Sequence, residues 1–186
     1  MRFTTALFVL VVLPAAAQRP FSRDLREPSQ NLAPFVGTPQ PVVDKMLELA
    51  NIRPGEIVYD LGCGDGRIVI AAARKFKARA VGVEIRRDIY EKTLARVAAL
   101  GLSDQVQIVQ GNALRYDLSS ADVVTLYLLT SSNERLKPQF EKYLKPTARI
   151  VSHDYEIRGW KPITVEKMIV GGREHAIYLY TVNAAK

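Results

Sequence analysis

The sequence is poor in the residues that build disulfides and metal centres. Its 186 residues include one cysteine, Cys63, and two histidines. A lone cysteine excludes an internal disulfide framework and a zinc site made of cysteines. The histidines, His153 and His175, are far apart in the chain and lack the short spacing that is typical of metal ligands. The sequence therefore predicts no metal site.

Low-complexity segments and long runs of one charge are also missing. The chain has 11 glycines and 10 prolines, too few for a collagen-like or repetitive protein, and its 48% apolar residues exclude a disordered chain. Basic residues outnumber acidic ones by 26 to 19, yet they are scattered, and runs such as Arg86–Arg87 stop at two residues. We therefore expect one globular domain with a solvated basic surface and no specific nucleic-acid partner.

The first 17 residues have the composition of a secretory signal peptide. Met1–Arg2 gives a positive start, residues 3–13 are almost entirely apolar, and alanines at 15 and 17 form an A-x-A cleavage site. The apolar run is shorter than the roughly 20 residues that a membrane-spanning helix requires, which argues against an uncleaved anchor. We expect cleavage after Ala17 and export to the periplasm or cell envelope, with a cytoplasmic location only if the signal is not used.

The remainder divides into a linker and a folded domain. Residues 18–34 are polar and contain prolines, with no helical or strand period, and are predicted to form a linker. The folded domain is expected over residues 35–186.

Within this domain, strands alternate with helices. The pattern predicts helices over residues 39–51, 67–76, 87–100 and 133–144, and strands over residues 56–60, 80–84, 106–109, 121–129 and 148–155. Two further strands, 163–170 and 175–182, are joined by Gly171–Gly172 and predict a C-terminal hairpin. This order indicates an α/β three-layer fold with a mostly parallel, seven-stranded sheet that ends in an antiparallel hairpin.

The most informative segment is the glycine-rich turn Asp60–Arg67, which follows the first predicted strand and opens a helix. A dinucleotide fingerprint, G-x-G-x-x-G, would place its third glycine at position 67, where this chain has an arginine. The next predicted strand ends in Glu84, and in nucleotide-binding α/β folds such an acid accepts hydrogen bonds from a ribose. Asp60, two residues before the first glycine, would repel a pyrophosphate but suits the cationic amino group of a methionine. The electrostatics therefore favour S-adenosylmethionine over NAD.

Val58–Arg67, together with Val81–Glu84, resembles motif I and its following acid in the class I S-adenosylmethionine-dependent methyltransferases. Further segments resemble a narrower group within them, and these are Phe35–Pro39, Ala121–Leu129, Val151–Ser152 and Trp160–Pro162. That group comprises the small protein-lysine methyltransferases that modify the adenine nucleotide translocase and the ATP synthase c subunit, with their bacterial and archaeal relatives. The resemblance implies a Rossmann-like methyltransferase fold, S-adenosylmethionine as the cofactor, and a protein lysine as the methyl acceptor, with a membrane protein as one possible substrate.

The resemblance also implies which residues would contact the cofactor. The expected contacts with the methionine end are Thr38, Asp60, Gly62 and Gly64. Glu84 would contact the ribose, and Asn112 and Ala113 would contact the adenine. The family often has an aspartate where Asn112 stands. The amide oxygen of an asparagine can still accept a hydrogen bond from the adenine amine.

A lysine acceptor must lose a proton before it is methylated, against an unperturbed pKa of ~10.4. Desolvation beside the cationic sulfonium would lower that pKa. The acceptor pocket is expected beyond the carboxyl ends of the first and fourth strands, where the sheet order changes direction. Tyr127 and Thr130, at the end of the fourth predicted strand, are the candidate catalytic residues that would orient the amine, followed by Asp154 and Tyr155 after the fifth.

Two alternatives stay open on the sequence alone. The same fold and cofactor would suit a methyltransferase that acts on a small molecule or a lipid, because no residue specifies the acceptor. The signal peptide would suit an exported binding module that has lost catalysis, because the methyl donor is made in the cytoplasm. The sequence leaves the oligomeric state open.

Overall fold

The computed structural model describes residues 32–33 and 35–182. The predicted signal peptide, residues 1–17, lies outside this part of the chain, as does nearly all of the predicted linker, residues 18–34. Within the described residues, no helix combines the length and apolarity needed to cross a membrane.

Seven strands form one sheet in the order β3-β2-β1-β4-β5-β7-β6. Their bounds are β1 (Ile57–Leu61), β2 (Arg79–Glu84), β3 (Val106–Gln110), β4 (Val123–Leu126), β5 (Arg149–His153), β6 (Thr164–Val170) and β7 (Arg173–Thr181). The first five strands are parallel, whereas β7 runs antiparallel to both β5 and β6. The expected mostly parallel sheet with a C-terminal hairpin is confirmed.

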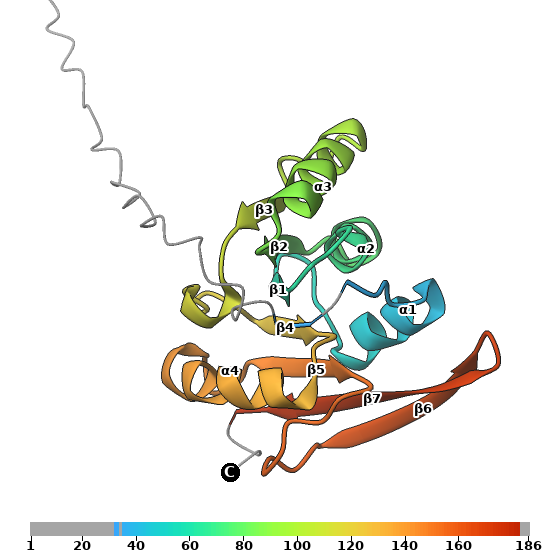
Figure 1. The fold of residues 1–186 in the computed structure, drawn as a ribbon, viewed down its shortest axis with the longest axis vertical. Helices are drawn as coiled ribbons and strands as arrows, with labels where there is room; N and C mark the ends of the chain where they lie inside the picture. The colour runs from blue at the N-terminus through green and yellow to red at the C-terminus, as the bar shows by residue number, and fades with distance from the viewer. Residues whose placement is uncertain (1–31, 34, 183–186) are drawn as a thin grey trace, which may run out of the picture.

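Helices cover both faces of this sheet. Figure 1 shows α1 (Gln40–Leu49), α2 (Arg67–Phe76) and α3 (Arg87–Ala99) on one face, and α4 (Thr130–Tyr143) on the other. The short 3-10 helix η2 (Ala113–Arg115) lies on the same side as α4. The molecule therefore has the three layers that the alternation of strands and helices predicts.

The sheet separates two apolar cores because successive residues of a strand point to opposite faces. In β1, Val58 packs in the core beneath α1 and α2, while Tyr59 packs in the core beneath α4. All four residues of β4 are buried, which agrees with the central, parallel position expected from its apolarity on both faces.

The structure corrects the boundary between the fourth strand and the following helix. β4 ends at Leu126 rather than at Leu129, and α4 begins at Thr130 rather than near Asn133. The carbonyl of Leu129 accepts hydrogen bonds from the backbone N–H groups of Ser132 and Asn133, so the chain turns into a helix at once. After β4, Leu128 lines the cavity and packs in the core beneath α4, whereas Leu129 is 40% exposed. A run of apolar residues therefore does not mark where this strand ends.

Candidate active site

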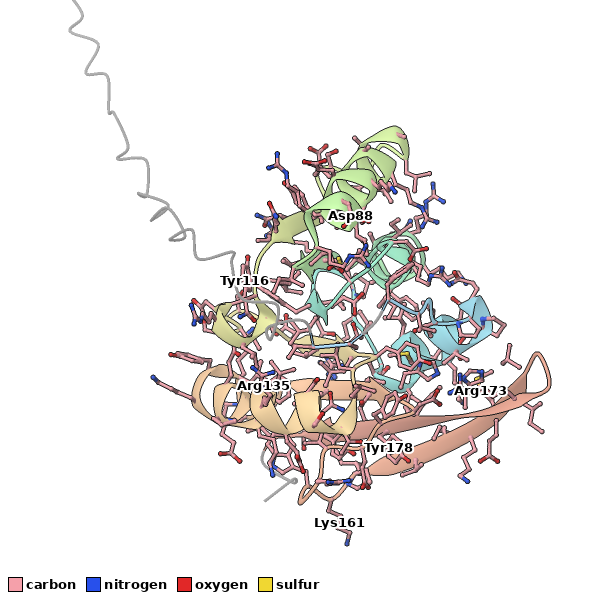
Figure 2. The ribbon with its side chains drawn as sticks, viewed as in Figure 1. Asp88, Tyr116, Arg135, Lys161, Arg173 and Tyr178 are labelled. Atoms are coloured by element: carbon pink, nitrogen blue, oxygen red, sulfur yellow. The ribbon has the colours of Figure 1, made fainter. Side chains whose placement is uncertain are left out.

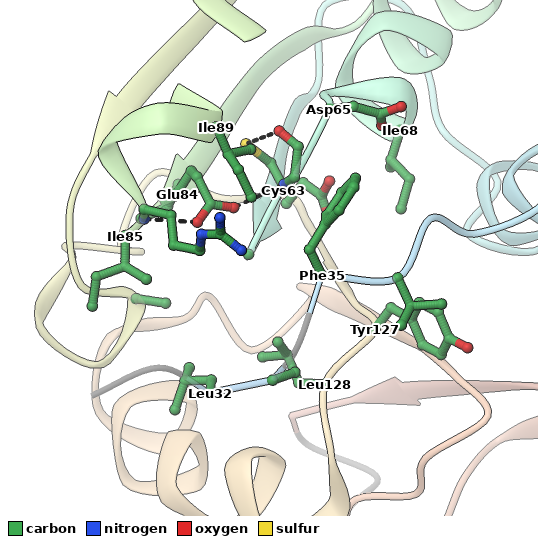
Figure 3. Close-up of a pocket in the computed structure, with 18 of the residues that line it drawn as sticks. Leu32, Phe35, Cys63, Asp65, Ile68, Glu84, Ile85, Ile89, Tyr127 and Leu128 are labelled. Carbon is green, nitrogen blue, oxygen red and sulfur yellow. Dashed lines mark hydrogen bonds between the residues drawn. The ribbon is translucent and has the colours of Figure 1, made fainter. Parts of the chain in front are cut away.

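A cavity opens at the carboxyl ends of β1 and β4, the two neighbouring strands at which the sheet order changes direction (Figure 3). Its volume, including the open mouth, is about 780 Å³. The wall is made by the chain segments that follow β1, β2, β3 and β4, together with residues between 32 and 38 that precede α1. The cavity thus lies at the place expected from the strand order.

The glycine-rich turn after β1 forms the floor of this cavity. Gly62, Gly64 and Gly66 have φ angles of 80°, 52° and 74°, in the left-handed region that favours glycine. A Cβ atom on Gly64 would also lie 2.4 Å from Cε2 of the Phe35 ring. Both the backbone conformation and the close approach of Phe35 therefore require glycine at position 64.

Asp60, at the end of β1, is a buried carboxyl in the cavity wall. It is 3% exposed, and its Oδ1 accepts a hydrogen bond of 2.8 Å from the Thr125 hydroxyl. Burial raises the pKa of Asp60 to about 7, against the hydrogen bond from Thr125 and together with the nearby charge of Glu84. A cation placed beside Asp60 would stabilise its ionised form and lower its pKa again.

Glu84, at the end of β2, is also buried rather than solvated. One carboxylate oxygen accepts a 3.0 Å hydrogen bond from the backbone N–H of Gly64, and the other accepts a 2.8 Å bond from that of Arg86. Figure 3 shows the side chain between these two amides at the cavity wall. Glu84 therefore holds the glycine turn in place, and its carboxylate faces the cavity beside it.

The other expected cofactor residues also line the cavity. Asn112 and Ala113 lie in the segment after β3, and the Asn112 Oδ1 accepts a 2.9 Å hydrogen bond from the N–H of Leu114, which caps η2. Thr38 is 3% exposed and lies at the opposite side of the cavity, before α1. The structure thus brings Thr38, Asp60, Glu84 and the segment after β3 around one space, although they come from four parts of the chain.

The two candidate catalytic residues are placed differently from each other. The Tyr127 ring borders the cavity, but Figure 3 shows its hydroxyl pointing away from the other lining side chains, and this hydroxyl donates to Asp154 Oδ2 at 3.4 Å. Thr130 is the first residue of α4 and is not among the residues that line the cavity. The expectation that Thr130 lies at the end of a strand is wrong, because the chain has already turned into the helix.

Arg67 is a structural residue of the site that sequence reasoning missed. Its guanidinium forms hydrogen bonds of 2.8 and 2.7 Å with the Asp65 carboxylate and donates a 2.8 Å bond to the carbonyl of Thr38. A Cβ atom on Gly37 would lie only 2.5 Å from this guanidinium. Arg67 therefore fastens the segment before α1 to the glycine turn. The sequence motif has an arginine where the dinucleotide fingerprint has glycine. The motif does not indicate which groups that arginine contacts.

Cys63 is a space-filling residue between the glycines of the turn. It is buried, and burial together with the charges of Asp60 and Glu84 raises the pKa of its thiol well above the ordinary value. A Cβ atom on Gly82 of β2 would lie 2.7 Å from the Cys63 sulfur. The thiol therefore packs against the neighbouring strand and is unsuited to act as a nucleophile at neutral pH.

Taken together, these residues fit S-adenosylmethionine. The cavity has a buried carboxyl at the end of β1 for a cationic amino group and a carboxylate at the end of β2 for hydroxyl donors. Between them, backbone without Cβ atoms allows a ligand to approach closely.

Two relatives of this chain are lysine methyltransferases. Residues 60–164 match the family model described as the ANTKMT methyltransferase domain. The chain is 49% identical over 154 residues to a protein-lysine N-methyltransferase of Saccharolobus islandicus, a match that covers 82% of this chain and 96% of that protein. It is 29% identical over 160 residues to the adenine nucleotide translocase lysine N-methyltransferase of Mus musculus, covering 86% of this chain and 68% of the mouse protein.

A solved structure is similar at a comparable level. The RNA methyltransferase from Salinibacter ruber in complex with S-adenosyl-L-homocysteine has 44% sequence identity and a TM-score of 0.73, and the match covers 79% of this chain and 94% of that one. The names of these relatives agree on methyl transfer and differ in the acceptor.

Proposed function

The chain belongs to the ANTKMT methyltransferase family and is an S-adenosylmethionine-dependent methyltransferase, and on this premise we propose that it methylates the side-chain amine of a lysine in a protein. The observation that carries the proposal is the 49% identity to the protein-lysine N-methyltransferase of Saccharolobus islandicus, which extends over 96% of that protein. A match of this extent includes the acceptor side of the fold as well as the glycine turn.

Within this proposal, the residues around the cavity divide into a cofactor set and an acceptor set. When bound, S-adenosylmethionine supplies an electrophilic methyl group on a cationic sulfonium. Asp60 binds the amino group of the methionine moiety, and Glu84 accepts hydrogen bonds from the ribose hydroxyls. Asn112 and Ala113 flank the adenine, while Thr38 closes the methionine end. Each of these side chains or backbone segments lines the cavity.

The acceptor set has to align an amine and exclude water, because methyl transfer from a sulfonium needs no acid to assist the leaving group. The Tyr127 ring and Leu128 form the cavity wall that follows β4. An apolar wall beside a positive charge disfavours a second cation and so lowers the pKa of an entering lysine ammonium. The Tyr127 hydroxyl bonds to Asp154, which fixes the orientation of the ring. Tyr127 therefore orients the acceptor chiefly through its ring.

RNA is the competing acceptor class, because the Salinibacter ruber structure is named an RNA methyltransferase. Binding of a polyanion depends on cationic side chains that are available to phosphates. The two arginines that line the cavity are both ion-paired, Arg67 with Asp65 at 2.7 Å and Arg86 with Asp88 at 2.8 Å. A neighbouring arginine, Arg96, also contacts Asp65 at 3.2 Å. These ion pairs lower the net positive charge at the cavity, and together with the 49% identity to the protein-lysine N-methyltransferase they favour a protein over an RNA acceptor.

A protein acceptor and an RNA acceptor can be distinguished by testing which enzyme releases the transferred methyl label, a protease or a ribonuclease. Purified protein is incubated with methyl-labelled S-adenosylmethionine and a cell extract, and the products are divided and treated with protease or ribonuclease. The proposal expects protease-sensitive label that is absent with Asp60→Ala and present with Asp104→Ala, a change at an exposed position. Label that only ribonuclease releases would contradict it.

We further propose that the N-terminal segment exports the protein and that its substrate is a membrane protein. Support for export comes from the charged start, apolar run and A-x-A site of residues 1–17, and support for the substrate comes from the similarity to the mouse enzyme named for the adenine nucleotide translocase. N-terminal sequencing of protein recovered from cell fractions tests export. A terminus at Gln18 in the envelope fraction is expected, and intact Met1 in the cytoplasm would contradict it.

A further inference from the structure

Two histidines and an aspartate converge beside the cavity, at the end of the sheet where β5 meets β7. His153 Nε2 lies 2.8 Å from His175 Nδ1, and Asp154 Oδ2 lies 3.3 Å from the first nitrogen and 3.6 Å from the second. The His153 and His175 side chains are 0% and 3% exposed, and that of Asp154 is 11% exposed. The histidine cluster, as we call His153, Asp154 and His175, is thus nearly enclosed.

The hairpin brings these residues together despite their separation in the sequence. His153, the last residue of β5, pairs with Ile177 of β7. His175 lies two residues before Ile177, so its side chain points to the same face of the sheet as that of His153. The chain then turns at Asp154, whose φ of 59° lies in the left-handed region. The register of the hairpin therefore makes neighbours of two histidines whose long spacing in the sequence predicted no metal site.

His153 and Asp154 each use one polar atom for a contact outside the cluster, and the second polar atom of each then points toward the other two residues of the cluster. His153 Nδ1 lies 3.3 Å from the Thr38 hydroxyl, which leaves Nε2 facing the cluster. Asp154 Oδ1 accepts a 3.1 Å hydrogen bond from the N–H of Ala176, and Oδ2 faces the cluster, where it also accepts a 3.4 Å bond from the Tyr127 hydroxyl. Support of a ligand through its outward-facing atom is typical of metal sites, where it fixes the ring orientation and the tautomer.

The distances suit a small tetrahedral ion. Zinc binds histidine nitrogen and carboxylate oxygen at about 2.0–2.2 Å, so neighbouring ligand atoms around it lie about 3.3–3.5 Å apart. Two of the three separations in the cluster, 3.3 and 3.6 Å, lie close to that range. The third, the 2.8 Å hydrogen bond between His153 and His175, would lengthen by about 0.5 Å when both nitrogens bind the ion. Among the described residues, this is the group of histidine, cysteine and acidic side chains whose ligand atoms lie close enough to hold a metal.

We propose that His153 Nε2, His175 Nδ1 and Asp154 Oδ2 bind a zinc ion, with a fourth position left for water. The ion would join the end of β5 to β7 directly behind Tyr127, whose ring centroid lies 3.9 Å from that of His153. It would therefore stabilise the acceptor side of the cavity. The proposal is independent of the methyl acceptor.

Arg173 competes with the ion for the aspartate. Its Nη2 lies 2.5 Å from Asp154 Oδ2, and its side chain is 57% exposed. Figure 2 shows Arg173 on the β6–β7 hairpin. An exposed arginine can move into solvent when zinc takes the carboxylate oxygen. Removal of its charge should therefore strengthen zinc binding, whereas loss of a ligand should abolish it.

The test uses the tag-free protein and zinc chloride alone. The chain has only two histidines and one cysteine, and Cys63 is buried, so stoichiometric zinc binding can be traced to the cluster. Titration calorimetry and native mass spectrometry should show one zinc per chain, with a higher melting temperature in its presence. Cobalt substitution should give the visible absorption of a tetrahedral site. No binding by the wild-type protein would overturn the proposal and leave an ordinary hydrogen-bonded histidine pair.

Two variants keep the result specific. His175→Asn retains a polar atom near the position of Nδ1 but not a good zinc ligand, and should lose zinc while it still binds S-adenosylhomocysteine, which reports a folded cofactor site. Arg173→Gln should bind zinc more tightly than the wild type. Zinc binding that His175→Asn leaves unchanged, or that Arg173→Gln weakens, would overturn the assignment.

Discussion

Asp60 should make the affinity for the cofactor depend on pH, and the size of the effect follows from its burial. Burial raises the pKa of Asp60 to about 7 in the ligand-free cavity. Such a carboxyl is about half ionised at pH 7 and about 1% ionised at pH 5. A cationic amino group binds the ionised form, so affinity should fall about 50-fold over this interval. The amino group itself, with an ordinary pKa of about 7.7–8.0, stays mainly protonated over this interval.

Titration calorimetry with S-adenosylhomocysteine at several pH values measures this dependence without turnover, and circular dichroism verifies the fold at each pH. Asp60→Asn keeps the shape and the hydrogen bond from Thr125 but cannot ionise, so its affinity should be lower at pH 7 and nearly independent of pH. Asp104→Asn, at an exposed position, is the matched control and should follow the wild type. A wild-type profile as flat as that of Asp60→Asn would refute the reasoning.

Three more predictions concern stability and the two sides of the cavity. The free energy of unfolding of the ligand-free protein should fall as pH rises from about 4 to 7, by up to about 4 kcal/mol relative to Asp60→Asn, because the folded state holds the Asp60 proton more tightly than the unfolded chain does. Denaturant titrations across this interval check it. Glu84→Ala should weaken cofactor binding by about 1.5–3 kcal/mol in calorimetry, whereas Glu141→Ala, at an exposed position, should not. Equal affinities of the two variants would remove Glu84 from the site. Tyr127→Ala should lower kcat more than cofactor affinity, Tyr127→Phe should have a smaller effect because the ring remains, and Thr130→Ala should stay near the wild type, as steady-state kinetics can show.

Patterns of a few consecutive residues predict the expected cofactor-binding part of this molecule well. The start of α2 at Arg67 is predicted correctly, because glycines disfavour a helix before it and the apolar residues after them have a helical period. Glu84 and Asp60 are found from their places at the ends of two predicted strands, and parallel neighbouring strands necessarily bring such ends to one edge. Each of these inferences needs only a few consecutive residues.

The acceptor side depends on contacts between distant segments, and there the sequence is less informative. The apolar run after β4 indicates burial without distinguishing a strand from a loop that covers the cavity, so Thr130 was misplaced. The approach of His153 to His175 depends on the register between β5 and β7, which a hairpin turn alone does not specify. The Thr38 carbonyl that Arg67 binds lies 29 residues away in the chain, and no local pattern identifies it.

The most direct test of the central claim is to locate the transferred methyl group. The purified protein is incubated with S-adenosylmethionine carrying a deuterated methyl group and with a membrane-protein extract, and the digested products are analysed by tandem mass spectrometry. Deuterated methyl groups are expected on the side-chain nitrogen of lysine, present with Asp104→Ala and lost with Asp60→Ala. Deuterated methyl found on oxygen, on a nucleobase or on a lipid headgroup, with none on lysine, would contradict it.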